Sequence, residues 1–403
     1  MNSAHAPHIF LVAGEESGDR LGAALIVALK RATQGRASFS AVGGMHMAEE
    51  GVPSLFPLGD VAIMGFAAIP ASLPKILRRI REAADAVIAA KPDVLVIIDS
   101  PEFTHRVARK VRARAPAIPI VDYVCPSVWA WRPGRARAMR AYVDHVLALL
   151  PFEPEAMKRL HGPPCNFVGH PLGEQVSLLR PNAEEARRRM ADPPLLLVLP
   201  GSRSGEIRRM AGVFGETVAL VAKRTGPLDV VVPAVPRLAN RVQAAIANWP
   251  VPARIVTGTA EKHAAFRSAR AALTKSGTST LELALAGVPM AAAYKVPLIE
   301  ELVGRLLITA PSAILANLIL GENVVPEFLQ RDCTPDNLAA ALLPLLTDTP
   351  HRRRQVAAFA RLDELMAIGG AAPSDRAAGV VLDCAGRLNQ PAREAMASAR
   401  PTG

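Results

Sequence analysis

Short apolar runs of the length of a β-strand recur along the chain, with amphipathic segments of helical pattern between them. The first half contains HIFLVA, SFSAVG, DVLVIID, IPIVDYV and HVLALLP, and the second half contains PLLLVLP, DVVVPA, ARIVTG, ARAALT and VPMAAAYK. Strands that are apolar on both faces and alternate with helices are typical of parallel sheets covered by helices on both sides. The pattern therefore predicts an α/β fold.

A break in this pattern divides the chain. The first series ends near CNFVGHPLGE and the second begins at PPLLLVLPGSR, with a segment rich in proline and charge between them, at about 172–192. A chain of 403 residues is long enough for two domains. We expect two doubly wound, Rossmann-like domains facing across a cleft, over residues 1–172 and 190–365. Residues 366–403 are expected to return to the first domain, and the last dozen have the composition of a disordered tail.

Charge and composition narrow the class of protein. The net charge of +11 indicates an anionic partner, which could be nucleic acid, an acidic membrane surface or a phosphorylated small molecule. Aromatic residues make up only 4% of the chain and no nucleic-acid-binding motif is present, so nucleic acid is the least favoured of the three. No apolar run is long enough to span a bilayer, and residues 1–7 do not resemble a secretory signal.

Cysteine and histidine spacing bears on metals and on the cellular compartment. The four cysteines are far apart in the sequence, which favours a reduced, cytoplasmic interior over a disulfide scaffold or a zinc ribbon. The nine histidines show no zinc-type spacing, so we expect no metal site.

A glycine-rich turn, AGEESGDRLG, follows the first predicted strand. Its glycine spacing is that of a phosphate loop, but it carries three carboxylates and no lysine. Carboxylates repel a diphosphate, whereas they accept hydrogen bonds from sugar hydroxyls or from a substrate amide. The turn is either a sugar-facing loop or a tight turn that caps a helix. Its candidate residues are Gly14, Glu16, Ser17 and Asp19.

Two further candidates follow later strands of the first domain. Asp99 comes directly after DVLVIID, where a carboxylate could serve as a general base or could bond the backbone of the next helix. The segment YVCPSVWAWRPGRARAMR places Trp129 and Arg132 among several arginines. It is either a basic lip around an anionic, partly apolar substrate or a basic helix with an aromatic anchor in the core.

Two loops of the second half have the pattern of a nucleotide site. LPGSRSGEI places a cation in a glycine turn between a strand and a helix, where backbone N–H groups and the arginine could receive a diphosphate. TKSGTSTLE places a polar turn before a helix that carries a carboxylate suited to ribose hydroxyls, although an ordinary helix cap has the same pattern. The candidates are Gly201, Ser202, Arg203, Ser276, Gly277, Thr278 and Glu282.

Residues 61–90 combine an apolar, proline-interrupted stretch with a basic helical pattern. This mixture suits an interfacial segment lying on anionic lipid, and an amphipathic helix that faces a protein core has a similar pattern. We expect membrane association near 61–82. The residues concerned are Ile63, Met64, Phe66, Lys75, Ile76, Leu77, Arg78 and Arg79.

Taken together and in order, AGEESGD, VGG with GVPSLFPL, YVCPSVWAWR, LPFE, FVGHPL, LPGSRSGEI, SGTSTLE and NVVPEFLQ resemble the lipid-A-disaccharide synthases, over about residues 8–330. The resemblance implies a two-domain GT-B glycosyltransferase, peripheral on the inner face of the cytoplasmic membrane. It implies transfer of 2,3-diacylglucosamine from UDP-2,3-diacylglucosamine to 2,3-diacylglucosamine 1-phosphate, with inversion. The products are a β-1,6-linked disaccharide 1-phosphate and UDP.

The same resemblance implies roles for individual residues. Asp99 would be the catalytic base, and the first domain would bind the acceptor through Gly14, Glu16, Ser17, Asp19, Trp129 and Arg132. Asn317 and Gln330 would join the loops named above in the donor site. No metal or cofactor is expected, and a homodimer remains open. The rival interpretations are another UDP-sugar enzyme of this architecture, such as a cell-wall N-acetylglucosaminyltransferase or an epimerase, a nucleic-acid-binding protein, and a nucleotide-binding protein without catalysis.

Overall fold

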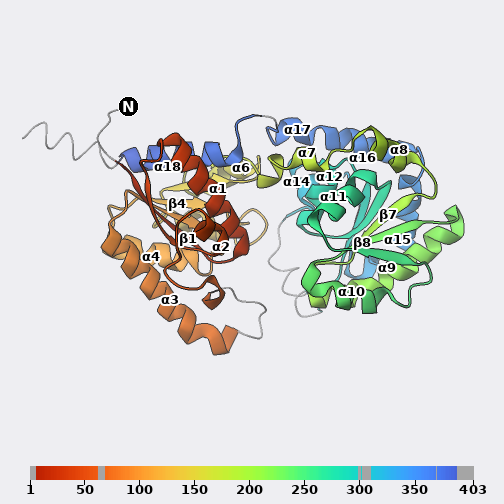
Figure 1. Cartoon of the computed structure of the whole chain (residues 1–403), viewed down its shortest axis with the longest axis horizontal. Helices are drawn as coiled ribbons and strands as arrows, with labels where there is room; N and C mark the ends of the chain where they lie inside the picture. Colours follow the sequence, from red (N-terminus) through yellow and green to blue (C-terminus); the bar gives the residue numbers. More distant parts are fainter. Residues whose placement is uncertain (1–5, 62–68, 298–300, 302–309, 369, 388–403) are drawn as a thin grey trace, which may run out of the picture. The chain divides into compact units, whose positions relative to one another are not determined.

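The computed structural model in Figure 1 describes residues 6–61, 69–297, 301, 310–368 and 370–387. The chain divides into two compact units. One unit comprises Met1–Pro171 and Gly370–Gly403, and the other comprises Leu172–Gly369. Within the described ranges, no helix combines the length and the apolar character needed to cross a membrane.

The first unit is built on a sheet of six parallel strands in the order β2-β1-β3-β4-β5-β6. The strands are β1 (His8–Ala13), β2 (Ser38–Val42), β3 (Val94–Ile98), β4 (Ile120–Tyr123), β5 (His145–Ala148) and β6 (Cys165–Phe167). The apolar runs of the sequence correspond to β1 through β5. The short β6 lies at the sheet edge, and none of its residues is fully buried, so it leaves no continuous apolar run.

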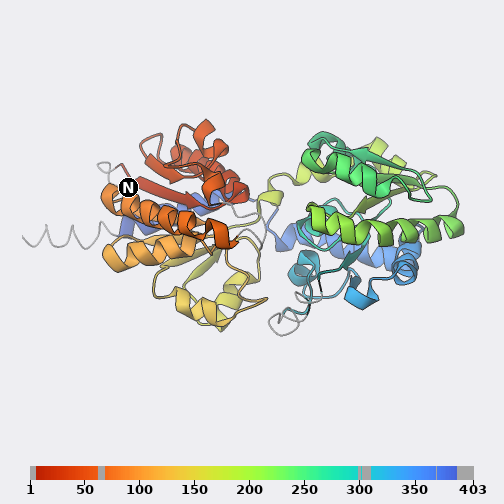
Figure 2. The same ribbon diagram turned by 90° about the horizontal axis from the view of Figure 1, so that it is seen from below.

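Helices cover both faces of this sheet (Figure 1). Because successive strand residues point to opposite faces, Phe10 and Val12 pack in the core beneath α3 and α4, whereas Ile9 and Leu11 pack in the core beneath α1 and α18. Figure 2 shows α3 and α4 side by side. The helices of this unit are α1 (Glu16–Ala32), α2 (Met45–Glu49), α3 (Ile69–Ala90), α4 (Thr104–Arg114), α5 (Gly134–Met139), α6 (Glu153–Arg159) and α18 (Pro373–Arg387).

The C-terminal helix α18 packs on α1, at the other end of the unit's sequence. Ala377, Ala378 and Val381 are buried in the core that α1 shares with the sheet. The side chains of Arg31 and Asp375 form an ion pair across the same contact. The first unit is therefore completed by α18, which follows the second unit in the sequence.

The second unit repeats the architecture with strand order β12-β11-β10-β7-β8-β9, again all parallel. Its strands are β7 (Leu195–Leu199), β8 (Asp229–Pro233), β9 (Ala253–Val256), β10 (Ala271–Lys275), β11 (Met290–Tyr294) and β12 (Glu327–Leu329). Its helices are α7 (Val176–Leu179), α8 (Ala183–Met190), α9 (Ser204–Thr225), α10 (Ala239–Ile246), α11 (Thr259–Ser268), α12 (Thr278–Leu285), α14 (Leu315–Leu320), α15 (Pro335–Leu342), α16 (Pro350–Ala360) and α17 (Leu362–Leu365).

The predicted fold class, two parallel α/β sheets of Rossmann type, is confirmed. Because every strand of a sheet runs the same way, the loops that follow the strands gather at one edge. Asp99 follows β3 at that edge of the first sheet, and Arg203 and Ser276 follow β7 and β10 in the second. The fold thus brings the candidate loops of each unit together.

The proposed membrane segment lies on α3 and the residues before it. Ile63, Met64 and Phe66 fall outside the described residues. Ile76 is 5% exposed and belongs to the core between α3 and the sheet. The expectation that Ile76 faces a membrane is therefore corrected, because burial in the protein core already removes this side chain from water.

The outer face of α3 nevertheless carries apolar side chains. Leu73 and Leu77 are 41% and 39% exposed and lie one turn apart on the same side of the helix. Lys75 and Arg78 are exposed along the same stretch. This portion of α3 retains the mixture of apolar and basic side chains that suits an anionic interface.

Arg79, also expected to contact the membrane, is engaged within the protein. Its guanidinium bonds Asp60 and Glu82, the latter at 2.6 Å, and stacks on the ring of Phe56 with 4.6 Å from the guanidinium carbon to the ring centroid. The Lys75 ammonium and the Arg79 guanidinium hold the pKa of the Asp60 carboxyl below its usual value. Arg79 therefore ties α3 to the loop before it.

Candidate active site

Asp99 lies in a strained turn at the end of β3. Asp99 and Ser100 both adopt positive φ angles, +54° and +44°, a conformation that costs a residue with a side chain on the order of 1–3 kcal/mol. Three contacts hold the turn. The Asp99 N–H donates to the Tyr123 carbonyl at 3.0 Å, the Thr104 hydroxyl donates to the Asp99 carbonyl at 2.6 Å, and the Ser100 N–H donates to Asp99 Oδ1 at 2.7 Å. Such strain is characteristic of functional sites.

The acidic turn of the first unit meets Asp99. The Ser17 hydroxyl, at the start of α1, is within hydrogen-bonding distance of Asp99 Oδ2 and of Glu15 Oε1, 3.1 Å from each. Gly14 makes this approach feasible, because a Cβ there would lie 2.4 Å from the Ser100 Cβ. Glu16 is exposed and pairs with Arg20 at 2.6 Å. The fold thus brings Ser17 next to Asp99, whereas the Glu16 carboxylate is engaged with Arg20.

Asp19, which the sequence placed in a sugar-facing loop, is buried. It is 1% exposed, and its carboxylate accepts hydrogen bonds from the backbone N–H groups of Gly44, His46 and Met47 at 2.7, 2.9 and 3.2 Å. These are the unpaired N–H groups at the start of α2. Asp19 therefore caps α2 across the sheet edge, and the expectation of a substrate contact is corrected.

Trp129 and Arg132 lie in the loop after β4. The half-buried Trp129 donates its indole N–H to Glu153 Oε1 at 3.1 Å and packs edge-on against Phe152, with ring centroids 5.0 Å apart. Arg132 is exposed and stacks on Trp131, 4.5 Å from the guanidinium carbon to the ring centroid. Both candidate residues are therefore held by aromatic contacts, Trp129 toward the core and Arg132 at the surface.

Glu153 was not singled out from the sequence, although it belongs to the LPFE motif. It is 3% exposed, and it also accepts a hydrogen bond from the Leu150 N–H at 2.9 Å. Burial raises the pKa of the Glu153 carboxyl to about 7, although the bonds from Leu150 and Trp129 act in the opposite direction. The indole N–H of Trp129 is thus bonded to a carboxyl whose pKa lies near neutral pH.

The second unit contains a pocket of about 410 Å³ at the carboxyl edge of its sheet. The loops after β7, β8, β9 and β10 line it. Five of the predicted donor residues are among the lining residues: Gly201, Ser202, Arg203, Gly277 and Thr278. The polar loops predicted for a nucleotide therefore converge on one cavity.

Glu206, which the sequence analysis did not select, occupies the N–H groups assigned to a diphosphate. Its 3% exposed carboxylate accepts from the Ser202 and Arg203 N–H groups at 3.0 and 3.2 Å. Gly201 has φ +133° and packs against it, so that a Cβ would lie 2.6 Å from Glu206 Oε2. The expectation that these N–H groups receive phosphate is corrected. The SRSGE spacing, a carboxylate three residues after the helix cap, could have revealed this.

Other cations and donors of the pocket come from β10, α11 and α12. Lys275 lies 3.1 Å from Glu206 Oε1, and Lys262 donates to Glu282 Oε1 at 2.8 Å. Glu282 does not line the pocket itself but holds Lys262, which does. α12 begins at Thr278, so its first turn directs backbone N–H groups toward the cavity.

Three predicted donor residues are engaged elsewhere in this unit. Ser276 donates to the Ala313 carbonyl at 3.0 Å. Asn317 is 2% exposed and bonds the backbone of Val324 and Val325 at 2.9–3.1 Å. Gln330 accepts from the Val296 N–H at 2.7 Å. Ser276, Asn317 and Gln330 therefore brace loops and do not line the described pocket.

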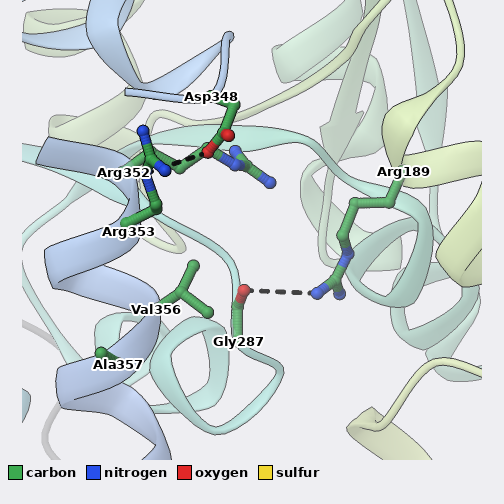
Figure 3. A pocket seen from close by; sticks show the side chains of 7 residues that line it. All are labelled: Arg189, Gly287, Asp348, Arg352, Arg353, Val356 and Ala357. Carbon is green, nitrogen blue, oxygen red and sulfur yellow. Dashed lines mark hydrogen bonds and ion pairs between the residues drawn. The ribbon is translucent and has the colours of Figure 1, made fainter. Parts of the chain in front are cut away.

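A second cavity of about 390 Å³ lies at the opposite edge of this sheet (Figure 3). Arg189 donates there to the carbonyls of Arg267, Ala286 and Gly287, which end α11 and α12, at 3.0–3.2 Å. Burial, with the nearby charge of Arg352, lowers the pKa of Arg189 to about 10. Arg189 satisfies carbonyls at two helix ends, so this cavity is not a candidate for the donor.

Comparison with known proteins decides the family. A family model described as lipid-A-disaccharide synthetase matches residues 9–370. The lipid-A-disaccharide synthase of Nitrobacter hamburgensis is 64% identical over 375 residues, which is 93% of this chain and 95% of that protein. The chain belongs to the lipid-A-disaccharide synthase family. The synthase of Rhodospirillum centenum is 44% identical over 378 residues, 93% of this chain and 94% of that protein.

Membership of the lipid-A-disaccharide synthase family confirms the resemblance inferred from the ordered motifs. The protein is a glycosyltransferase of lipid A biosynthesis. This excludes a nucleic-acid-binding protein as the main interpretation, and the net positive charge needs another explanation.

Solved structures support the fold of these synthases. UDP-GlcNAc 2-epimerase from Neisseria meningitidis, bound to UDP-GlcNAc, has a TM-score of 0.61 at 13% identity, covering 93% of this chain and 100% of that one. MurG of Acinetobacter baumannii has a TM-score of 0.57 at 17% identity, covering 94% and 99%. At such low identity the likeness concerns the GT-B-like fold alone.

Proposed function

We propose that the chain transfers 2,3-diacylglucosamine from UDP-2,3-diacylglucosamine to the 6-hydroxyl of 2,3-diacylglucosamine 1-phosphate, with inversion at the anomeric carbon. The products are the β-1,6-linked lipid A disaccharide 1-phosphate and UDP. Family membership supports the reaction. The observation that carries the proposal is the Asp99 carboxylate, held in a strained turn at the end of β3.

Asp99 is the proposed general base. One of its oxygens, Oδ1, is fixed by the Ser100 N–H, and the other, Oδ2, meets a hydroxyl, that of Ser17. The acceptor 6-hydroxyl takes a comparable position at Oδ2 and gives up its proton there. Its oxygen then bonds the anomeric carbon as the bond from that carbon to UDP breaks, and the electron pair of the broken bond leaves with UDP.

The donor nucleotide occupies the pocket of the second unit. The exposed Arg203 side chain and the first-turn N–H groups of α12, at Thr278 and Ser279, stabilise the negative charge that grows on UDP. Glu206 shapes the loop that carries Arg203. Neither a metal nor a cofactor is part of this proposal.

Both substrates carry acyl chains, so we place the enzyme peripherally on the anionic inner face of the cytoplasmic membrane. The exposed leucines and basic residues of α3 support this placement, as does the net charge of +11. The first unit, which carries Asp99 and α3, is the proposed acceptor domain, and the second is the proposed donor domain.

The reaction is tested by measuring UDP release from UDP-2,3-diacylglucosamine in detergent with a metal chelator, with and without 2,3-diacylglucosamine 1-phosphate. We expect release to depend on the acceptor and to accompany a disaccharide product. UDP binding without release would favour another acceptor or a protein that binds nucleotide without catalysis.

The role of Asp99 is tested by Asp99→Asn, which keeps the shape of the side chain and removes the base. We expect kcat to fall at least about 100-fold, the range typical of a lost general base. Asp93→Asn is the matched control, since Asp93 lies just before the other end of β3 and accepts the His8 N–H at 2.7 Å. Near-normal turnover by Asp99→Asn would refute the assignment.

A further inference from the structure

A buried cluster of polar side chains lies close to the Asp99 turn in the first unit. His105 Nε2 is 3.0 Å from Asp122 Oδ2, and His105 Nδ1 is 3.1 Å from the Tyr142 hydroxyl. Arg109 donates to the same hydroxyl at 3.3 Å and stacks on the Tyr142 ring. Asp122, His105 and Tyr142 are 1%, 4% and 4% exposed. This cluster of side chains links β4, α4 and the loop after α5.

Each member of the His105–Asp122 pair is adjacent in sequence to a residue that holds the Asp99 turn. Asp122 precedes Tyr123, whose carbonyl accepts the Asp99 N–H at 3.0 Å. His105 follows Thr104, whose buried hydroxyl donates to the Asp99 carbonyl at 2.6 Å. The pair therefore cross-links the two backbone segments that grip the turn from β4 and from α4.

Stability alone does not account for such a pair. Burying an aspartate and a histidine removes both from water, and apolar side chains of similar size would hold the same space at equal or lower cost. Burial raises the pKa of the Asp122 carboxyl, and the nearby His105 acts in the opposite direction. The charge of Asp122 also interacts with Asp99, Arg135 and Cys125. The polar pair is thus costly and lies beside the strained turn.

We propose that His105 and Asp122 are positioning residues for Asp99, which fix the left-handed turn so that the Asp99 carboxylate is held toward the acceptor. This inference rests on the proposed role of Asp99 as the base. Because the pair acts through Asp99, its removal lowers turnover only while Asp99 is the base. A pair that merely stabilised the unit would lower activity regardless of the residue at position 99.

The experiment is a double-mutant cycle between the pair and Asp99. His105→Leu/Asp122→Leu removes both partners together and leaves no unpaired charge. It is combined with Asp99 and with Asp99→Asn, and kcat, KM and the affinity for UDP are measured for each protein. We expect kcat to fall at least 10-fold with Asp99 present, KM for the donor to change less than twofold, and no further fall in the Asp99→Asn protein.

Two further variants keep the test sharp. Asp122→Asn keeps the shape of the side chain and an oxygen facing His105 Nε2, so kcat should stay within threefold. If the double leucine variant fails to fold, His105→Leu/Asp122→Asn takes its place in the cycle, because it also breaks the pair and leaves no unpaired charge. His145→Leu is the matched control, because His145 is another buried histidine of this sheet, paired with Asn166 at 2.7 Å; its kcat should not change.

The outcomes separate the two proposals. An equal fall of kcat with Asp99 and with Asn at position 99, or an unchanged kcat in the double variant, overturns the positioning role. A large loss in Asp122→Asn also overturns it, because geometry is retained there. Failure of the catalytic assignment is seen separately, as normal turnover of Asp99→Asn alone.

Discussion

Lys275 lies 3.1 Å from the buried carboxylate of Glu206, and the same carboxylate accepts the N–H groups of the loop that carries Arg203. One side chain therefore joins the loop after β7 to the end of β10 in the wall of the pocket proposed to bind the donor. The negative charge of Glu206 offsets that of Lys275, and its oxygen fixes the backbone at Arg203, so the loop is held in shape without a ligand.

Replacing Glu206, which lines the pocket and holds the loop of Arg203, should therefore weaken nucleotide binding. Glu206→Ala frees two N–H groups and leaves Lys275 unpaired, and we expect the Kd for UDP to rise about 10-fold, which corresponds to about 1.4 kcal/mol. Calorimetric titration with UDP measures this. Glu185→Ala is the matched control, since Glu185 accepts the Asn182 N–H at 3.0 Å at the start of α8 and neither residue lines the pocket. An effect of Glu185→Ala as large as that of Glu206→Ala would contradict the role of Glu206.

Asp19 should behave as a structural residue. Asp19→Ala leaves the N–H groups of Gly44, His46 and Met47 without their acceptor, so the free energy of unfolding should fall by about 3 kcal/mol. Binding of UDP to the second unit should not change. Glu16→Ala, which removes an exposed i,i+4 ion pair, should cost no more than about 0.5 kcal/mol. Denaturant unfolding of the three proteins distinguishes them, and equal stabilities would be inconsistent with the capping role.

The sequence pattern was sufficient for the fold and for the location of the loops. Continuous apolar runs mark strands that are covered on both faces, and a residue that follows such a run lies at the carboxyl edge of a parallel sheet. For this reason the sequence alone places Asp99, Arg203 and Gly277 at the carboxyl edges of their sheets. The edge strands β6 and β12 were not predicted, because each has only three residues and none of them is fully buried.

Which polar atoms are already engaged could not be read from the pattern. Asp19 is bonded by N–H groups some 25 residues further along the chain, and Asn317 is held by a loop that closes onto its own helix. His105 and Asp122 come together only because β3 and β4 are neighbours. Hydropathy reports the face on which a residue lies, whereas these contacts depend on how loops close in three dimensions. Glu206 is the exception, because its spacing is a local capping signal.

The outer face of α3 provides a test of membrane association. Two exposed leucines that enter the interface contribute about 3 kcal/mol together, so Leu73→Glu/Leu77→Glu should lower binding to vesicles of anionic phospholipid by at least about 10-fold. Sedimentation with vesicles at low salt measures this, and UDP affinity should be retained. Leu178→Glu is the control, since Leu178 is 53% exposed in the other unit. Undiminished vesicle binding by the α3 variant would assign the membrane contact to another surface.

Glu153 should make the stability of the first unit depend on pH. Burial raises the pKa of its carboxyl to about 7 in the folded protein, above the ordinary value of 4.5, so the neutral form is favoured by folding. Its contribution is complete below pH 4.5 and is lost as pH rises through about 7, with a change of up to about 3 kcal/mol. Glu153→Gln, which cannot ionise, should gain stability relative to the wild-type protein between pH 5 and pH 8. Melting temperatures at both pH values measure this difference, and Glu155→Gln, at an exposed position of the same helix, should show none. If the wild-type protein and Glu153→Gln keep a constant difference across this range, Glu153 is ionised throughout, and the loop of Trp129 rests on a carboxylate instead of a neutral acid.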